Sequence, residues 1–284
     1  MRIGITSPVV VRQPGVSSPW EAKAGAAELA RIAEAADELG FHHLTCSEHV
    51  AIPEDVAEER GSTYWDPAVT LGFLAARTSR IRLVTQVLVL GYHHPLRIAK
   101  QYGTLDTISG GRVTLGLGVG SLREEFALLG APFEERGRRA DDAAAALRAA
   151  LSERVPSYQG EFYAFDGLVV EPHTVQEPVP LWFGGRTARS LRRAATYGHG
   201  WVPFGLSPDQ LREMLGRFAL PGGFDIVLSP GRPLDPLGSP EAALRALTRL
   251  RDAGATVLSA SVTAEDADHY SAQLEALMSL AAPL

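Results

Sequence analysis

The sequence alternates between short apolar segments typical of buried strands and longer amphipathic segments typical of helices. About eight such pairs follow one another along the 284 residues, with no linker, internal repeat or break in composition. Alternating strands and helices favour a parallel sheet, and eight units are the number that closes a (β/α)8 TIM barrel. We therefore predict an α/β chain with a single TIM-barrel domain over residues 1–284. An open, doubly wound sheet is the alternative.

Two neighbouring strands in this scheme carry the clearest signals. The predicted third strand, Ile81–Leu90, is apolar over most of its length, and after Arg82 only Thr85 and Gln86 interrupt the apolar run, as expected for a strand that is buried on both faces. The predicted fourth strand, Arg112–Leu117, alternates in polarity and follows a turn of two glycines. Both segments are predicted to form the wall of the barrel.

The fourth strand runs directly into Gly118, Val119 and Gly120. Glycine at this density lets the backbone approach a flat ring or a phosphate without an intervening side chain. A junction between a strand and a helix is also where α/β proteins bind ligands. We predict that these three residues contact a cofactor, and the alternative is a tight turn without a ligand. The spacing does not match a dinucleotide fingerprint, because Ser121 stands where the third glycine belongs.

Composition narrows the possible partners. The net charge is −6 and no basic run is present, which argues against a nucleic-acid surface. No apolar stretch approaches the length of a membrane span. The single cysteine, Cys46, fits a reducing compartment, so we expect a cytoplasmic protein that binds neither nucleic acid nor a membrane. The adjacent pairs His42-His43 and His93-His94 lack a carboxylate at metal-ligand spacing, and we predict no metal site.

The carboxyl ends of the strands carry the chemistry of a TIM barrel, and the second predicted strand ends in Glu48-His49. An imidazole can gain or lose a proton near neutral pH, so His49 could act as an acid, a base or a cation. Glu48 could orient the imidazole, although neighbours in a strand point to opposite faces. We predict both as catalytic residues, with a loop-capping histidine as the alternative. Ser7, after the first strand, and Gln86, in the third, are predicted to contact a cofactor.

A second glycine turn, Gly184-Gly185-Arg186-Thr187, opens a predicted helix. Free N–H groups at the start of a helix attract anions, and the arginine adds positive charge. We predict that these four residues bind the phosphate of a cofactor. A β–α turn with a solvated arginine is the alternative.

Two segments interrupt the alternation. Ile52–Tyr64 is a polar stretch that is too long for a simple turn, and loops of that length are usually functional or mobile. Ser157–Val170 is rich in aromatic residues and reads as a hairpin. We expect both segments to shape the substrate side of the site.

Four stretches together resemble the luciferase-like monooxygenase superfamily and, within it, the F420-dependent oxidoreductases. They are LTCSEH (Leu44–His49), IRLVTQVLVLGYHHP (Ile81–Pro95), GGRVTLGLGVGSLREEF (Gly110–Phe126) and PVPLWFGGRTARSLRRAATYGHGW (Pro178–Trp201). The resemblance covers nearly the whole chain up to Trp201 and is thin beyond it.

The resemblance implies a TIM barrel with a bulged third strand. In F420-binding relatives the bulge holds a non-proline cis peptide behind the deazaflavin ring, and here that bond would join Gln86 and Val87. The resemblance also places His49 near the reactive face of the ring. Relatives usually dimerise through barrel helices, so a homodimer is expected, with Ala68–Ala76 and Leu96–Ile108 as the segments that supply small and apolar residues.

We therefore expect an oxidoreductase that transfers a hydride between coenzyme F420 and a small organic substrate, with His49 as the acid or base. An FMN-dependent monooxygenase with a separate flavin reductase is the first alternative, and a flavin-binding or deazaflavin-binding barrel without catalysis is the second. The chain departs from the pattern in one respect. Some F420-dependent dehydrogenases of this superfamily carry a glutamate acid where this chain has Ser121.

Overall fold

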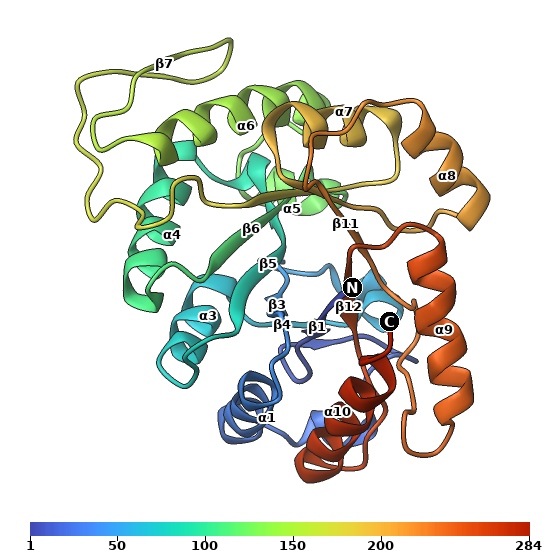
Figure 1. Cartoon of the computed structure of the whole chain (residues 1–284). Coiled ribbons are helices and arrows are strands. Elements are labelled where there is room, and N and C mark those ends of the chain that lie inside the picture. Colours follow the sequence, from blue (N-terminus) through green and yellow to red (C-terminus); the bar gives the residue numbers. More distant parts are fainter.

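A computed structural model describes residues 1–284 and shows a closed barrel of eight parallel strands with helices on its outside (Figure 1). The strands follow the order β1-β12-β11-β10-β9-β6-β5-β3 around the barrel. Their bounds are β1 (Arg2–Thr6), β3 (His43–Cys46), β5 (Arg82–Val89), β6 (Val113–Gly118), β9 (Leu181–Gly184), β10 (Gly200–Val202), β11 (Asp225–Leu228) and β12 (Val257–Ala260). The predicted (β/α)8 TIM barrel is confirmed.

The helices pack on the barrel through apolar faces. The main ones are α1 (Ala26–Glu38), α3 (Pro67–Ala75), α4 (Pro95–Ser109), α5 (Arg123–Leu128), α6 (Arg136–Ser152), α7 (Ala188–Tyr197), α8 (Pro208–Gly216), α9 (Pro240–Asp252) and α10 (Ala267–Ala281). Helix α1 buries Leu29, Ile32 and Ala36 on one side, the spacing of an amphipathic helix. Asp66 caps α3 by accepting the N–H of Val69 at 2.9 Å. None of the helices combines the length and apolar composition needed to cross a membrane.

The third barrel strand, β5, is bulged as the resemblance implies. Its pairing with β6 shifts register between Thr85 and Leu88, and the Gln86–Val87 peptide bond is cis. The end of β3 holds the bulge, because the hydroxyl of Ser47 donates to the carbonyl oxygen of Gln86 at 2.6 Å. β6 comes so close to β5 here that a Cβ on Gly116 would lie 2.0 Å from the carbonyl oxygen of Thr85.

The polar segment expected to be a loop contains regular structure. Residues Glu54–Arg60 form helix α2, and β4 (Thr63–Tyr64) pairs with β2 (Val11–Arg12) in a short antiparallel ribbon. This ribbon joins the connection after β1 to the connection after β3.

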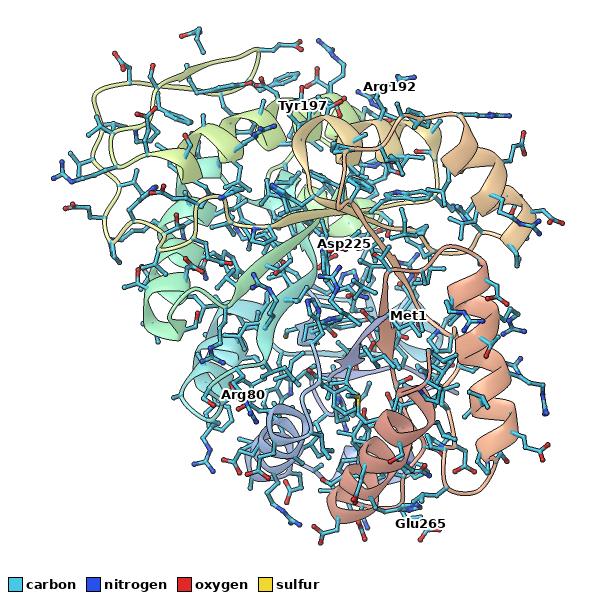
Figure 2. The ribbon with its side chains drawn as sticks, viewed as in Figure 1. Met1, Arg80, Arg192, Tyr197, Asp225 and Glu265 are labelled. Carbon is cyan, nitrogen blue, oxygen red and sulfur yellow. The ribbon has the colours of Figure 1, made fainter.

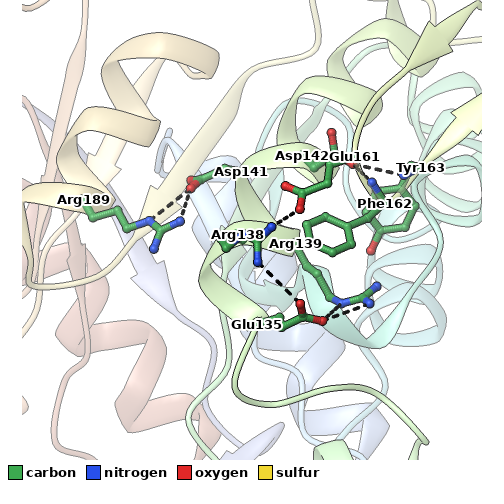
Figure 3. A network of polar contacts seen from close by, with 9 residues as sticks. All are labelled: Glu135, Arg138, Arg139, Asp141, Asp142, Glu161, Phe162, Tyr163 and Arg189. Atoms are coloured by element: carbon green, nitrogen blue, oxygen red, sulfur yellow. Dashed lines mark hydrogen bonds and ion pairs between the residues drawn. The ribbon is translucent and has the colours of Figure 1, made fainter.

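The aromatic excursion is a hairpin, as predicted, formed by β7 (Tyr158–Gln159) and β8 (Ala164–Phe165). It projects from the barrel beside α6 (Figure 1). Asp142 of α6 anchors it by accepting the N–H groups of Phe162 at 2.6 Å and Tyr163 at 3.0 Å (Figure 3). None of the hairpin residues lines the cavity at the carboxyl ends of the barrel strands. The expectation that this segment shapes the substrate side is therefore wrong.

Two histidines lie at the amino-terminal end of the barrel. His43 is fully buried and meets Trp182 edge-on, with ring centroids 5.5 Å apart. Gly4 makes room for it, because a Cβ there would lie 2.1 Å from Nδ1 of His43. The ring of His42 stacks on the same tryptophan at 6.2 Å. Both imidazoles are therefore held in place by packing.

We expect the stability of the barrel to depend on the protonation of His42. Burial, followed by the charges of Arg2 and Arg82, lowers the pKa of His42 to about 4, against about 6.5 in an unfolded chain. Between these values the unfolded state binds more protons than the folded state, so the free energy of unfolding rises with pH from about 4 to about 6.5. Urea denaturation over this range should show a shallower pH dependence for His42→Asn, and an unchanged dependence would contradict the assignment.

Candidate active site

The carboxyl ends of the barrel strands surround a cavity of about 570 Å³. Sites for small molecules usually measure about 300–1,000 Å³. The cavity wall contains nine of the predicted site residues, Glu48, His49, Gln86, Val87, Gly118, Val119, Gly120, Gly184 and Gly185. The barrel thus brings segments from β3, β5, β6 and β9 together at one site.

Ser7 is not part of this wall. Its side chain is buried and lines a separate, small cavity together with Glu21 and Tyr270. After β1 the chain turns away from the barrel mouth, because Val9 adopts a φ of 73° and its N–H donates to Glu21 at 2.8 Å. The prediction that Ser7 contacts a cofactor in the main cavity is therefore wrong.

Arg186 and Thr187 also lie outside the cavity wall, and both are exposed. The hydroxyl of Thr187 accepts the N–H of Ser190 at 3.3 Å and so caps α7. The N–H of Gly185 donates to the carbonyl oxygen of Val202 at 3.2 Å. Of the predicted phosphate turn, only the two glycines line the cavity. The threonine caps α7, and the side chain of the arginine is exposed to solvent.

The glycines of the cavity wall are explained first by the packing of the wall itself. A Cβ on Gly118 would lie 2.5 Å from Cγ2 of Val87. A Cβ on Gly120 would lie 2.6 Å from Cε2 of Phe126. The absence of a Cβ at these two positions therefore makes room for the bulge of β5 and for α5. The approach of a cofactor ring to the same glycines stays a prediction.

Glu48 supports the bulged strand. Its Oε2 accepts the N–H of Val89 at 2.7 Å, and its Oε1 lies 2.6 Å from Nε2 of His93. The residue is only 8% exposed. Both carboxylate oxygens therefore have partners in the protein and position β5. Glu48 does not orient the imidazole of His49 as predicted, and its catalytic role stays a prediction.

The carboxylate that orients His49 is Glu125, which the sequence analysis missed. Its Oε2 lies 2.6 Å from Nδ1 of His49, and its Oε1 accepts the N–H groups of Val50 at 2.6 Å and Ala51 at 3.2 Å. The hydroxyl of Tyr92 donates to Oε2 at 2.9 Å. The side chain of Glu125 is 1% exposed. Because an ionised carboxylate only accepts hydrogen bonds, Nδ1 of His49 carries a proton.

Aromatic side chains complete the surroundings of the imidazole. The ring of Tyr64 packs edge-on against His49, with centroids 4.5 Å apart. Burial, followed by the hydrogen bond to Glu125, raises the pKa of Tyr92, so its hydroxyl stays protonated as a donor. Nε2 of His49 has no hydrogen-bond partner within the protein, and the residue lines the cavity. This nitrogen is the one available to a ligand.

The residues that the sequence analysis missed come from its less regular segments. Tyr64 of β4 and Gln13, which follows β2, line the cavity, and the unusual length of the polar segment was the available signal for Tyr64. Glu125 lies in the stretch LREEF, which supported the family resemblance. Burial of its side chain within the first turn of α5 could not be read from spacing in so short a helix.

Comparisons with known proteins agree with this fold. The model of the luciferase-like monooxygenase family matches residues 1–222. An uncharacterized protein of Mycobacterium tuberculosis is 31% identical over 198 residues, which cover 66% of this chain and 68% of that protein. The FMNH2-dependent dimethylsulfone monooxygenase of Pseudomonas putida is 30% identical over 131 residues, which cover 45% of this chain and 36% of that enzyme.

Solved structures show the same architecture over the whole chain. The monooxygenase RslO1 of Streptomyces bottropensis superposes with a TM-score of 0.76 at 26% identity, covering 100% of this chain and 99% of that one. An F420-dependent secondary alcohol dehydrogenase, solved with an F420–acetone adduct, also gives a TM-score of 0.76, at 14% identity and with 98% and 97% of the two chains covered. With the family model matching most of its length, this chain belongs to the luciferase-like monooxygenase family, a family of oxidoreductases.

Proposed function

We propose that this protein transfers a hydride between coenzyme F420 and a small organic substrate, with both molecules bound in the cavity. The observation that carries the proposal is the arrangement of His49. Its Nδ1 is fixed by the buried carboxylate of Glu125, and its Nε2 is free on a residue of the cavity wall. Hydride exchange between a carbonyl and an alcohol requires a proton at the substrate oxygen, and a positioned imidazole can donate or accept it.

The cavity suits a flavin-type ring in size and in lining. Apolar side chains, including Val87, Val119 and Leu228, offer surfaces for a flat ring, while Gln86 and Ser229 offer polar contacts. A few polar groups in a mostly apolar wall are typical of cofactor sites. When bound, such a ring supplies the hydride chemistry, and the protein supplies binding and orientation.

Glu125 suits His49 to a role in both directions of proton transfer. When Nε2 accepts a proton, the imidazole becomes a cation beside the carboxylate, and a nearby opposite charge favours that form. When Nε2 donates its proton, the Nδ1–H remains bonded to Glu125 at 2.6 Å. The tautomer and the orientation of the ring therefore stay the same before and after the transfer.

A second candidate is an FMN-dependent monooxygenase that receives reduced flavin from a separate reductase. The 26% identity to RslO1 along the whole chain and the local similarity to the FMNH2-dependent dimethylsulfone monooxygenase favour it. In that reaction His49 would hold a ligand oxygen by a hydrogen bond. A barrel that binds a flavin or a deazaflavin without catalysis is the third candidate.

Titration with each cofactor followed by turnover assays separates these functions. We expect F420 to bind, with quenching of its fluorescence, and to be reduced or oxidised with a panel of alcohols and carbonyl compounds. His49→Ala should lower turnover by about 10²–10⁴-fold, with little change in cofactor affinity. His49→Gln, which cannot carry a proton, should be nearly as slow. Binding of FMN with oxygen consumption would instead support the monooxygenase, and binding without any turnover the third candidate.

The role proposed for Glu125 predicts a large effect at a single carboxylate. Glu125→Ala removes the acceptor for His49, Val50 and Ala51, and leaving buried donors unpaired costs about 1–3 kcal/mol. We expect a loss of that size in urea denaturation, together with turnover as low as that of His49→Ala. The matched control is Glu124→Ala, because this neighbour is exposed and a surface change should stay within about 0.5 kcal/mol. Equal behaviour of the two variants would contradict the role of Glu125.

We also propose that the protein acts in the cytoplasm as a homodimer formed by α3 and α4. Val69 and Phe73 of α3 are 74% and 38% exposed, and Ile108 of α4 is 65% exposed. Burying such side chains between two copies would remove apolar surface from water. Light scattering at micromolar concentration should therefore give the mass of a dimer for the parent chain and of a monomer for Val69→Glu. Leu244→Glu on α9, 38% exposed in the parent, is the control that should remain dimeric, and a monomeric parent would refute the proposal.

A further inference from the structure

A chain of hydrogen bonds runs through the barrel from its amino-terminal end to the cavity wall. Nη1 of Arg2 lies 3.5 Å from Nε2 of His42, and Nδ1 of His42 lies 3.0 Å from Nδ1 of His43. Nε2 of His43 then lies 2.8 Å from the hydroxyl of Ser259, which lies 3.2 Å from Oε1 of Gln86. None of these hydrogen-bonded side chains takes part in the proposed proton transfer at His49.

From these contacts we infer that Arg2 determines which partner donates at every hydrogen bond between Arg2 and Gln86. As a result, Gln86 presents its side-chain N–H groups to the cavity as donors for a carbonyl or anionic oxygen of the bound ring. The ligand part of this inference rests on the proposed function. Gln86 is a positioning residue in this scheme, distinct from the acid or base at His49. Its backbone is held independently, because the hydroxyl of Ser47 donates to its carbonyl oxygen.

The direction follows from the chemistry of the two ends. An arginine side chain only donates, so Nε2 of His42 must accept. A neutral imidazole has one N–H, which therefore lies on Nδ1 of His42 and donates to Nδ1 of His43. The single proton of His43 then lies on Nε2 and donates to Ser259. The hydroxyl of Ser259 is left to donate to Oε1 of Gln86, and each link has one donor and one acceptor.

The opposite direction fails at the first link. If the amide of Gln86 were turned to donate to Ser259, every proton of the chain would move to the other side of its contact. His42 would then carry its proton on Nε2, facing Nη1 of Arg2, so two donors would meet. Arg2 is held against such a change by its ion pair with the carboxylate of Asp225, which also accepts the hydroxyl of Thr256 at 3.1 Å. Figure 2 labels Asp225, which is the first residue of the barrel strand β11.

Packing keeps the two imidazoles from turning over. Trp182 contacts both rings, and Gly4 leaves just enough room for His43. Oε1 of Gln86 is occupied by Ser259, whereas its Nε2 has no hydrogen-bond partner within the protein. Since Gln86 lines the cavity, its N–H groups remain for a ligand. A hydrogen-bond donor at this place selects a ligand with an oxygen acceptor on the ring.

Nitrogen-15 NMR of the ligand-free protein tests the direction without any cofactor. At about pH 7 we expect the Nδ1–H tautomer for His42 and the Nε2–H tautomer for His43. Arg2→Lys, which keeps a donor, should leave the tautomers of His42 and His43 unchanged. Arg2→Met, which removes the donor, should give a mixture of tautomers at both histidines. Arg31→Met is the control, because this exposed arginine pairs only with Asp268. The opposite tautomers in the parent chain would overturn the inference even if Arg2→Met does not fold.

Cofactor affinity tests the ligand part. Gln86→Met keeps the size of the side chain but removes the donor, and it should weaken binding of whichever of F420 or FMN binds by about fivefold. Ser259→Ala frees the amide and should weaken binding in the same direction while changing the tautomer balance of His43. Unchanged affinity in Gln86→Met would overturn the role assigned to Gln86. A parent protein that binds neither cofactor would defeat the proposed function, whereas the histidine tautomers would still decide the direction of the chain.

Discussion

The cavity depends on the attachment of the β5 bulge to the end of β3. Where the register of β5 shifts, its backbone groups lose their regular partners in the neighbouring strand. Side-chain and backbone groups of the residues that follow β3 take the place of these partners. The hydroxyl of Ser47 donates to the carbonyl oxygen of Gln86, and the N–H of Glu48 donates to the carbonyl oxygen of Val87 at 3.3 Å. The carboxylate of Glu48 accepts the N–H of Val89. Buried backbone groups need such partners. The next residue along the chain is His49, so the segment after β3 that holds the bulge also carries the imidazole.

Two buried glutamates, Glu48 and Glu125, each bind both an irregular backbone segment and a histidine side chain. Each contacts a histidine with one oxygen and accepts backbone N–H groups of an irregular segment with the other, one in the case of Glu48 and two in the case of Glu125. Glu48 does this for the end of β5 and for His93, and Glu125 does it for the loop after β3 and for His49. A buried carboxylate is stable only when several donors surround it. The donors that satisfy the two charges therefore also fix the loops that surround the cavity.

The sequence predicted the barrel well and its site in part, for a physical reason. Strand and helix patterns are local, so eight units could be counted, and the ends of parallel strands meet at one rim. The family resemblance added the bulge at Gln86 and Val87. Glu125 could not be paired with His49, because 76 residues separate them and the contact exists only after β6 and α5 are in place. Ser7 failed for the opposite reason, since its position after a strand was correct but a local turn at Val9 carries the chain away.

The placement of the carboxylate defines how protons reach this site. The resemblance relates Ser121 to a glutamate that acts as an acid in some F420-dependent enzymes, and here Ser121 lines the cavity with a small neutral side chain. Glu125 follows four residues later, about one helical turn. Its carboxylate contacts Nδ1 of His49 and is almost fully buried. Its oxygens are occupied by His49, two backbone N–H groups and Tyr92. A carboxylate enclosed in this way adjusts the charge and orientation of the imidazole without meeting the ligand. Under the proposed function, proton exchange with the substrate is then concentrated at one atom, Nε2 of His49.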